Sequence, residues 1–451
     1  MIQQLVILGA TGDLTARFLL PALGALRAGG HVDERFGLTC VGREDWTGDA
    51  YRAWAAEQLD RHAPEIPAGR RREVAAAARY HRADVTDPGE LAPVLPHDEP
   101  VAAYLALPPS IFPATVTALH TAGTATGSTV VLEKPFGESL HDALELNQLL
   151  AGRYPERSIF RVDHFLAMST VLNLLGVRLA NRVLEPIWNG LHIERVDIVW
   201  DESLALEGRA GYYDGVGALK DMLQNHLLQL LCLVAMEPPV SLGDRDLRDR
   251  KMDVLRSVRP LGLHDAAQRS RRARYTAGAG VPAYVDEDGV DPTHHTETFA
   301  ELELELDNWR WPGTRFRLRT GKALRAARQE VAVHFRPVPH LPFSGDVTAA
   351  PNVLRFGLEP ESVSLHLTGT TARGDVLTPL TLAATPEPAD LPPYGRLLLD
   401  VLHGNPALSI RADEAEESWR VVTPVLDAWA KDLVPMEEYP AGSDGPPPRR
   451  P

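Results

Sequence analysis

The 451-residue sequence predicts two domains: a doubly wound α/β domain over residues 1–165 and a larger α+β domain over 166–438. In the first part, short apolar runs alternate with helical patterns, which is typical of a parallel sheet built from βαβ units. After about residue 165, long helical stretches are followed by segments whose apolar residues alternate at period two. This alternation favours a mixed, mainly antiparallel sheet. The Pro- and Gly-rich segment 439–451 is predicted to be a disordered tail.

Continuous apolar runs mark the predicted strands of the first domain. They cover residues 4–8, 38–42, 101–107 and 129–132. Runs of this length, bounded by glycine, proline or charged residues, indicate strands that are buried on both faces. After the first run, apolar residues recur at helical spacing from Leu14 to Leu26, and two glycines end the helix.

In the second domain, residues 170–185 and 217–236 have helical patterns. The segments 301–311 and 315–321 alternate like strands.

Composition excludes several classes of function. The formal charge is −15 and the pI about 5.5, which argues against nucleic acid as a partner because phosphate binding requires a basic surface. The N-terminus has no basic region or cleavage site, and no apolar run reaches membrane-spanning length, so we expect a cytoplasmic protein without a membrane partner. Cys40 and Cys232 stand in apolar contexts, which predicts two buried thiols, no disulfide and no metal site.

The sequence GATGDL, residues 9–14, follows the first predicted strand and opens a helix. Glycines at such a turn let the backbone approach a pyrophosphate, and helix-terminal N–H groups favour the anion. Only Gly9 and Gly12 fit the G-x-G-x-x-G pattern, because Ile7 occupies its first glycine position. A turn without a ligand is therefore an open alternative.

The sequence GRED, residues 42–45, follows the second predicted strand, where a dinucleotide enzyme reads the adenine ribose. Arg43 would suit the 2′-phosphate of NADP, and Glu44 would suit the free 2′-hydroxyl of NAD. A solvated charged loop is the alternative without function. The presence of Arg43 favours NADP slightly.

A second group of polar residues interrupts an apolar helix at Gln224, Asn225, His226 and Gln229. Buried polar groups must be hydrogen-bonded or functional, so His226 is either a satisfied core residue or a reactive one. Asp221 lies five positions before His226, so on an α-helix the two need not share a face.

Nine motifs occur in one order along the chain: GATGDL, YLALPPSIF, EKPFG, RVDHF, LANRVLEPIWN, EGRAGYYD, DMLQNHLLQLLCLVAMEPP, ETFAELELELDNWRW and RTGKAL. They resemble the glucose-6-phosphate dehydrogenase family, and the resemblance extends from about residue 3 to residue 422. It implies a Rossmann domain followed by a large α+β domain. It also implies an enzyme that oxidises C1 of a hexopyranose to the 1,5-lactone and passes the hydride to NADP or NAD. Homodimers or homotetramers are expected as well.

The resemblance implies a role for each matching residue. His226 would be the general base, and Asp163 would orient its imidazole and stabilise the cation. Sugar contacts would come from Lys134, His164, Glu207, Asp221 and Lys322. The cofactor would be bound by Gly9, Thr11, Gly12, Asp13, Leu14, Arg43 and Pro135, with the Lys134–Pro135 bond often cis in the family. The GRED loop departs from the family, whose loop is usually one or two residues longer before its Arg.

One segment departs more strongly from the family pattern. The family reads Asp-His-Tyr-Leu-Gly-Lys-Glu, in which His, Tyr and Lys bind the sugar phosphate, whereas this chain has Phe165 and Met168 at the Tyr and Lys positions. A hydrogen bond to a charged group contributes about 1.5–3 kcal/mol, so losing two such donors would weaken phosphate recognition by orders of magnitude. Phe165 and Met168 would offer apolar, adaptable surface to the substrate instead.

Two readings explain this departure. The leading prediction is an unphosphorylated or modified sugar with unchanged chemistry. The alternative is an ordinary glucose-6-phosphate 1-dehydrogenase in which nearby arginines replace the lost contacts; these are Arg315, Arg317, Arg319, Arg325 and Arg328. A non-catalytic regulator or scaffold on this fold is a third hypothesis, which the retained Asp163 and His226 oppose.

Overall fold

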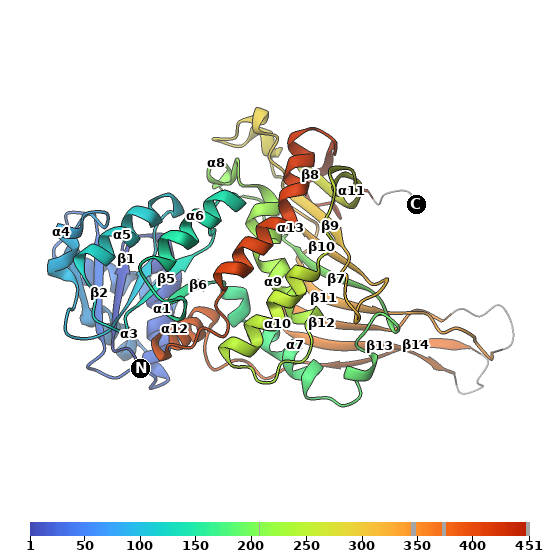
Figure 1. Ribbon diagram of the computed structural model, residues 1–451, viewed down its shortest axis with the longest axis horizontal. Helices are drawn as coiled ribbons and strands as arrows, with labels where there is room; N and C mark the ends of the chain where they lie inside the picture. The colour runs from blue at the N-terminus through green and yellow to red at the C-terminus, as the bar shows by residue number, and fades with distance from the viewer. Residues whose placement is uncertain (207, 344–348, 372–375, 448–451) are drawn as a thin grey trace. The chain divides into compact units, whose positions relative to one another are not determined.

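The computed structural model describes residues 1–206, 208–343, 349–371 and 376–447 (Figure 1). The chain divides into two compact units, which are described separately. The first contains Met1–Ser169, Val240–Arg248 and Pro388–Glu416; the second contains Thr170–Pro239, Asp249–Glu387 and Glu417–Pro451. The chain first passes from one unit to the other after Ser169, four residues beyond the boundary expected after residue 165. The structure differs from the prediction in the late segment Pro388–Glu416, which belongs to the first unit.

Six parallel strands form the sheet of the first unit, in the order β3-β2-β1-β4-β5-β6. Their bounds are β1 (Gln4–Leu8), β2 (Gly37–Gly42), β3 (Ala78–Arg82), β4 (Val101–Leu105), β5 (Thr129–Glu133) and β6 (Ile159–Val162). The four predicted strands are confirmed. The strand order reverses between β1 and β4, and ligands of open α/β sheets bind at the carboxyl ends of strands beside such a reversal.

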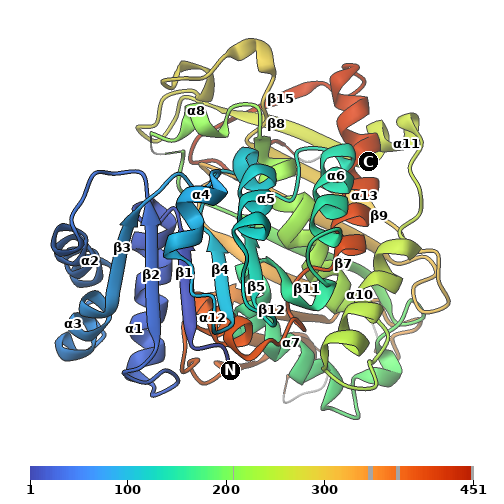
Figure 2. The same ribbon diagram turned by 60° about the vertical axis from the view of Figure 1, so that its left-hand side comes forward.

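Helices complete the first unit. They include η1 (Thr15–Leu19), a π-helical turn, α1 (Leu20–Ala28), α2 (Gly48–His62), α3 (Ala68–Ala77), α4 (Pro88–Leu91), η2 (Ala92–Val94), η3 (Pro109–Ile111), α5 (Phe112–Ala122), α6 (Leu140–Ala151), η4 (Glu156–Ser158), η5 (His164–Ala167) and α12 (Pro393–His403). α5 and α6 lie side by side (Figure 2). α12 comes from the late segment and packs against α1, η1 and η5. The predicted helix after the first strand is confirmed as η1 followed by α1.

Nine strands form the sheet of the second unit, in the order β14-β13-β12-β11-β7-β10-β9-β8-β15. They are β7 (Ile193–Asp201), β8 (Ser270–Thr276), β9 (Phe299–Leu304), β10 (Arg315–Gly321), β11 (Arg328–Phe335), β12 (Val353–Glu359), β13 (Ser362–Thr370), β14 (Leu377–Ala384) and β15 (Met436–Pro440). Among the described strands of this sheet, only β7–β10 and β8–β15 pair in parallel, which confirms the mixed, mainly antiparallel sheet.

The second unit also contains α7 (Ser169–Leu179, whose first residue is counted in the first unit), α8 (Ala210–Tyr213), η7 (Leu219–Leu227), α9 (Leu228–Ala235) and α11 (Leu263–Arg269). The helices α10 (Asp244–Ser257) and α13 (Ala412–Ala430) also contain residues of both units. None of the helices in the described ranges is long and apolar enough to cross a membrane.

The end of the chain differs from the predicted tail. Tyr439 and Pro440 belong to β15, which pairs with β8. Beyond the strand, the backbone N–H of Arg325 donates to the carbonyl of Ser443 over 2.8 Å, and Arg271 donates to the carbonyl of Pro447 over 2.8 Å. Residues 448–451 lie outside the described residues. The high Pro and Gly content of this segment therefore does not prevent it from packing.

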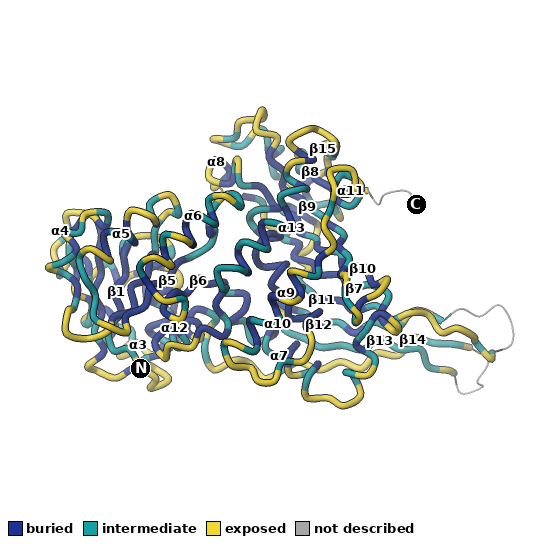
Figure 3. The backbone as a smooth tube through the Cα atoms, viewed as in Figure 1, coloured by how far each residue is buried: buried dark blue, intermediate teal, exposed yellow. Residues whose placement is uncertain are grey.

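Burial in the second unit falls toward one end of the sheet. Figure 3 shows β7 and β10 mainly in dark blue and teal, and β13 and β14 in teal and yellow. The helix pair η7 and α9 is almost wholly buried, and η7 packs against β7, β9 and β10. Cys232 lies within α9 and Cys40 within β2, and both are buried, as predicted.

The C-terminus of α9 is buried, so its last carbonyl groups need donors from the protein. Trp188 Nε1 donates to the carbonyl of Val234 over 2.9 Å, and Trp311 Nε1 donates to the carbonyl of Ala235 over 2.7 Å. The guanidinium of Arg178 donates to the carbonyls of Leu233 and Met236. These side chains satisfy carbonyls that a helix end otherwise leaves unpaired.

We expect Trp311→Phe to lower the free energy of unfolding by at least about 1–3 kcal/mol, because it removes the donor to the buried Ala235 carbonyl. The matched control is Trp309→Phe, two positions earlier, because Trp309 is fully exposed. Urea unfolding monitored by circular dichroism measures both. Equal midpoints for the two variants would contradict the role assigned to the Trp311 indole.

Candidate functional site

The glycine turn after β1 has the geometry of a phosphate-binding turn. Gly9 has φ +90°, and a Cβ there would lie 2.2 Å from the carbonyl oxygen of Ala106, so only glycine fits. A Cβ at Gly12 would approach only the carbonyl of Gly9, at 3.4 Å, which leaves this backbone open to a ligand. The turn leads directly into η1, whose N-cap position is Leu14. Exposed backbone at a helix start suits a pyrophosphate.

The other predicted cofactor residues lie around this turn or at the ends of neighbouring strands. Thr11 is half-buried, and Asp13 is exposed in the same turn. Arg43 follows β2 and is exposed. Pro135 follows β5, and its bond to Lys134 is cis. All of these residues belong to the first unit, at the carboxyl ends of its strands.

Glu133, at the end of β5, was not predicted as a site residue. Its carboxylate accepts a hydrogen bond from the hydroxyl of Tyr104 in β4 and interacts with the hydroxyl of Tyr394 in α12. Burial raises the pKa of Glu133 to about 7, and the charge of Asp163 adds to this, while both hydroxyls and the charge of Lys134 oppose it. The carboxyl next to the proposed substrate lysine can therefore change its protonation near neutral pH.

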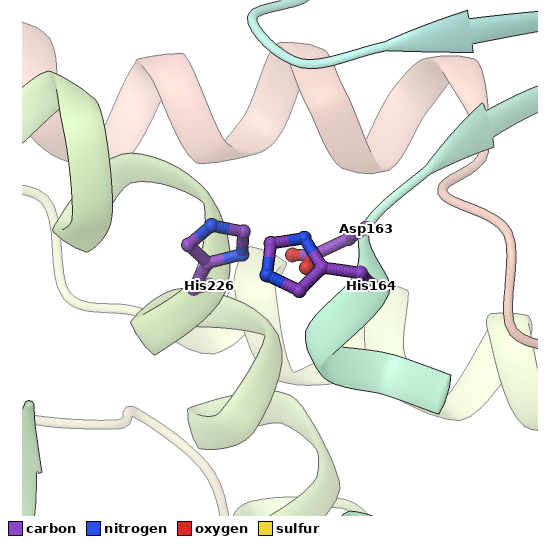
Figure 4. Close-up of side chains that lie close together, drawn as sticks. All are labelled: Asp163, His164 and His226. Carbon is purple, nitrogen blue, oxygen red and sulfur yellow. The ribbon is translucent and has the colours of Figure 1, made fainter. Parts of the chain in front are cut away.

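Asp163 and His164 follow β6 directly (Figure 4). Asp163 caps η5: its Oδ1 accepts the backbone N–H of Phe165 over 2.9 Å, and its side chain is 2% exposed. The imidazole of His164 stacks on the ring of Tyr394, with centroids 5.5 Å apart and planes 17° apart. The hydroxyl of Tyr394 interacts with Glu133, so Tyr394 links Glu133 to the ring of His164.

The two residues that depart from the family pattern lie in and after η5. Phe165 is 3% exposed, and its ring packs edge-on against His164 with centroids 5.0 Å apart. Met168 is half-buried at the C-cap of η5. Phe165 is thus a packed residue, whereas Met168 keeps part of its surface.

In the second unit, Asp221 and His226 lie on η7, the green helical segment of Figure 4 that carries His226. This segment is a π-helix, in which residue i bonds with residue i+5, so these two residues are one wide turn apart. The expectation that Asp221 and His226 lie on an α-helix is therefore wrong. His226 is 1% exposed, and its backbone N–H donates to Oδ1 of Asn225 over 2.6 Å.

Asn225 and Gln229, two other polar residues of this helix pair, have structural partners. Asn225 Nδ2 donates to the carbonyl of Lys220 over 3.0 Å, and Oε1 of Gln229 accepts a hydrogen bond from Lys251 over 2.9 Å. The first turn of η7 is held by the buried Glu297, whose Oε1 accepts the N–H of Leu219 over 2.9 Å. Burial raises the pKa of Glu297 to about 7. These interactions fix the helix that presents His226.

Lys322 lies just beyond β10 and faces two carboxylates. Its Nζ donates to Glu202 over 2.8 Å and lies 3.8 Å from Oδ2 of Asp221. It also lies 5.6 Å from the centroid of the Tyr213 ring. Lys322 and Asp221, both predicted to bind the sugar, are thus brought together, and Glu202 joins them as a residue that the sequence did not reveal. The predicted residue Glu207 lies outside the described residues.

The arginines offered as replacement phosphate ligands are engaged elsewhere in the second unit. Arg317 donates to Asp197 over 3.0 Å, and Arg319 donates to Asp201 over 3.0 Å. The remaining contacts are Arg328 to Asp201 at 3.7 Å, Arg325 to Asp444 at 3.4 Å, and Arg315 to Glu194 and Glu303 at 3.9 Å. Each of these arginines therefore faces at least one carboxylate.

Four residues near the candidate site could not be selected from the sequence alone. Glu133 opens the motif EKPFG, but nothing in the motif gives a chemical reason to select it, and Tyr394 lies outside the nine motifs. Glu297 opens the motif ETFAELELELDNWRW and Glu202 follows Asp201, but only the fold places them at the start of η7 and beside Lys322.

An open parallel sheet with a glycine turn beside the reversal of strand order is typical of the dinucleotide-binding domain of a dehydrogenase. The family model for the glucose-6-phosphate dehydrogenase NAD binding domain matches residues 6–173, and the model for its C-terminal domain matches residues 175–450. The chain belongs to the glucose-6-phosphate dehydrogenase family. It is therefore an oxidoreductase that acts on a CH–OH group of a sugar with NAD or NADP.

Individual relatives agree over the full length. Glucose-6-phosphate 1-dehydrogenase of Treponema pallidum is 38% identical, covering 98% of this chain and 92% of the relative, and that of Zymomonas mobilis is 36% identical, covering 99% and 96%. The crystal structure of the Mycobacterium avium enzyme superposes with a TM-score of 0.87 at 34% identity, covering 99% and 96%. A glucose-6-phosphate dehydrogenase in complex with glucose-6-phosphate gives a TM-score of 0.89 at 30% identity, covering 99% and 95%.

We expect Glu133→Gln to flatten the pH dependence of stability. The pKa of Glu133 in the folded protein, about 7, lies above its ordinary value of 4.5, so folding favours the protonated form. This stabilisation is fully present below about pH 4.5 and is lost as the pH rises through 7. In wild type the free energy of unfolding should therefore fall across this range, by up to about 1.4 kcal/mol per pH unit for this group. Glu297 adds a fall of the same sign in wild type and variant.

Urea unfolding at half-unit steps from pH 4.5 to pH 8 measures the slope. Glu138→Gln is the control, because Glu138 is exposed a few residues further along the same loop. A slope in Glu133→Gln that equals the wild-type slope would contradict the assigned pKa.

Proposed function

We propose that the protein oxidises glucose 6-phosphate at C1 to the 1,5-lactone with NAD or NADP, as an ordinary member of its family. The observation that carries this is the 36–38% identity, over nearly the whole of both chains, to enzymes named glucose-6-phosphate 1-dehydrogenase. The comparisons support this alternative better than the unphosphorylated sugar that the sequence analysis favoured. The changes at Phe165 and Met168 then act on affinity and leave the class of substrate unchanged.

In the proposed reaction, an imidazole nitrogen of His226 takes the proton of the C1 hydroxyl while the hydride leaves C1. Asp163 orients this imidazole and stabilises its positive charge, as a carboxylate does for a catalytic histidine. The bound nicotinamide ring supplies the hydride acceptor. The low exposure of His226 and Asp163, 1% and 2%, supports these roles, because electrostatic interactions are stronger where water is excluded.

The remaining site residues are proposed to bind substrate. Asp221 and Glu207 would accept hydrogen bonds from sugar hydroxyls, Lys322 would contact the sugar or its phosphate, and Lys134 would contact sugar and cofactor. His164 is the phosphate ligand retained in its segment, and its stacking on Tyr394 supports an oriented ring.

The protein is further proposed to be a cytoplasmic homodimer or homotetramer. Support for self-association comes from the β13–β14 end of the large sheet, where Leu380 and Leu382 are 48% and 55% exposed on β14. Neighbouring exposed leucines on one strand favour a covered interface.

Purified protein should form NADH or NADPH with glucose 6-phosphate much faster than with glucose or glucosamine. His226→Ala should lower kcat by about 10²–10⁴-fold, because a general base contributes about that factor. His264→Ala, at an exposed position on α11, is the control and should leave the rate unchanged. Absorbance at 340 nm measures all of these rates. Faster turnover of an unphosphorylated hexose would refute the proposed substrate.

Met168→Lys should lower KM for glucose 6-phosphate by about tenfold or more, because it restores a charge-assisted hydrogen bond to the phosphate. Met168→Leu keeps an apolar side chain and serves as the control. With glucose as substrate, neither variant should change KM. A Met168→Lys enzyme with unchanged KM for glucose 6-phosphate would show that residue 168 does not reach the phosphate.

A further inference from the structure

The carboxylate of Glu44 lies against the glycine turn, although its residue is exposed. Thr11 Oγ1 donates to Oε2 of Glu44 over 2.8 Å. A Cβ at Gly42 would come within 2.9 Å of the same oxygen, so the glycine leaves room for the carboxylate. Thr11 follows β1 and Glu44 follows β2, and adenosine ribose is read at the carboxyl ends of these two strands in dinucleotide folds.

Aromatic residues pack against the loop that carries Glu44 and hold its backbone. Tyr80 Oη in β3 donates to the backbone carbonyl of Glu44 over 2.8 Å. The ring of Trp46 packs against Tyr80 and Tyr51, with centroids 6.2 Å and 6.4 Å apart. Glu44 therefore projects from a fixed backbone rather than from a free surface loop.

The surroundings keep Glu44 ionised. Burial raises the pKa of Glu44, but the hydrogen bond from Thr11, backbone N–H groups of Glu44 and Arg43, and the charge of Arg43 outweigh it and leave the pKa below its ordinary value. The other charged groups nearby are Asp45 and Arg82, which pair over 3.3 Å, and Asp84, which interacts electrostatically with Arg43. Three carboxylates thus face two guanidinium groups.

We propose that Glu44 makes this enzyme select NAD over NADP. Its carboxylate accepts a hydrogen bond from the 2′-hydroxyl of the adenosine ribose and repels a 2′-phosphate at the same place. This inference deepens the proposed function and rests on it. It reverses the preference for NADP that Arg43 suggested, because Arg43 interacts with Glu44 and Asp84 and so does not offer an isolated positive charge.

The test is direct titration of the full-length protein with NADH and with NADPH. Nucleotide fluorescence reports binding, and no sugar is present. The variants are Glu44→Gln, which keeps the size and an acceptor for Thr11 but removes the charge, and Glu44→Ala, which removes both. Asp45→Asn is the matched control, because it removes the neighbouring charge and the pair with Arg82 but leaves the Thr11–Glu44 contact.

We expect wild type to bind NADH at least about tenfold more tightly than NADPH, since juxtaposed like charges are costly. Both Glu44 variants should shift the ratio of the two dissociation constants toward NADPH by about tenfold or more, and Asp45→Asn should leave it unchanged. Tighter binding of NADPH by wild type, or an unchanged ratio in Glu44→Gln, would overturn the inference while leaving the dehydrogenase function intact. Binding of neither nucleotide would instead contradict the proposed function itself, and the inference with it.

Discussion

The buried end of α9 sets a constraint on which the second unit depends. A helix that ends away from water leaves carbonyl groups that must find donors, and the free-energy cost of failing is similar to that of losing a core side chain. Here the donors are the indoles of Trp188 and Trp311 and the guanidinium of Arg178. These residues come from three separate segments, so satisfying one helix end draws those segments together. Because η7 continues directly into α9, the same interactions fix the helix that carries His226.

The sequence predicted most of the fold because its signals were local. The uninterrupted runs of β1, β2, β4 and β5 correspond to strands buried on both faces. The strands β3 and β6 were missed for a physical reason. β3 has the sequence ARYHR, whose polar residues suit an edge strand, and β6 contains Arg161, which is buried only because Glu156 and Asn147 bind its guanidinium. A charge inside a strand cannot be recognised as buried until its partners are known.

The candidate site residues likewise fall into those that local sequence patterns indicate and those that depend on partners distant in the sequence. Gly9 and His226 could be selected as candidates from the sequence, because glycine at a turn and a polar residue in an apolar helix each carry a chemical reason. Glu133 and Glu297 were not selected, although both have pKa values near 7 in the structure. Their behaviour comes from burial and from partners far away in the sequence, such as Tyr394 for Glu133. Likewise, no pattern in the sequence predicts that Asp221 and His226 lie on a π-helix, in which residues five apart are one turn apart.

The late return of α12 to the first unit has a consequence for how the chain is synthesised. The six strands of the nucleotide-binding sheet are complete by residue 162, but α12, which packs on α1 and supplies Tyr394, begins only at residue 393. During translation the surface of the first unit that binds α12 stays uncovered until residues 163–392, about half of the chain, have been synthesised. Exposed apolar surface on an incomplete domain promotes aggregation, so this topology favours chaperone protection of the nascent N-terminal half. The half that binds the dinucleotide is begun first and is finished late in synthesis.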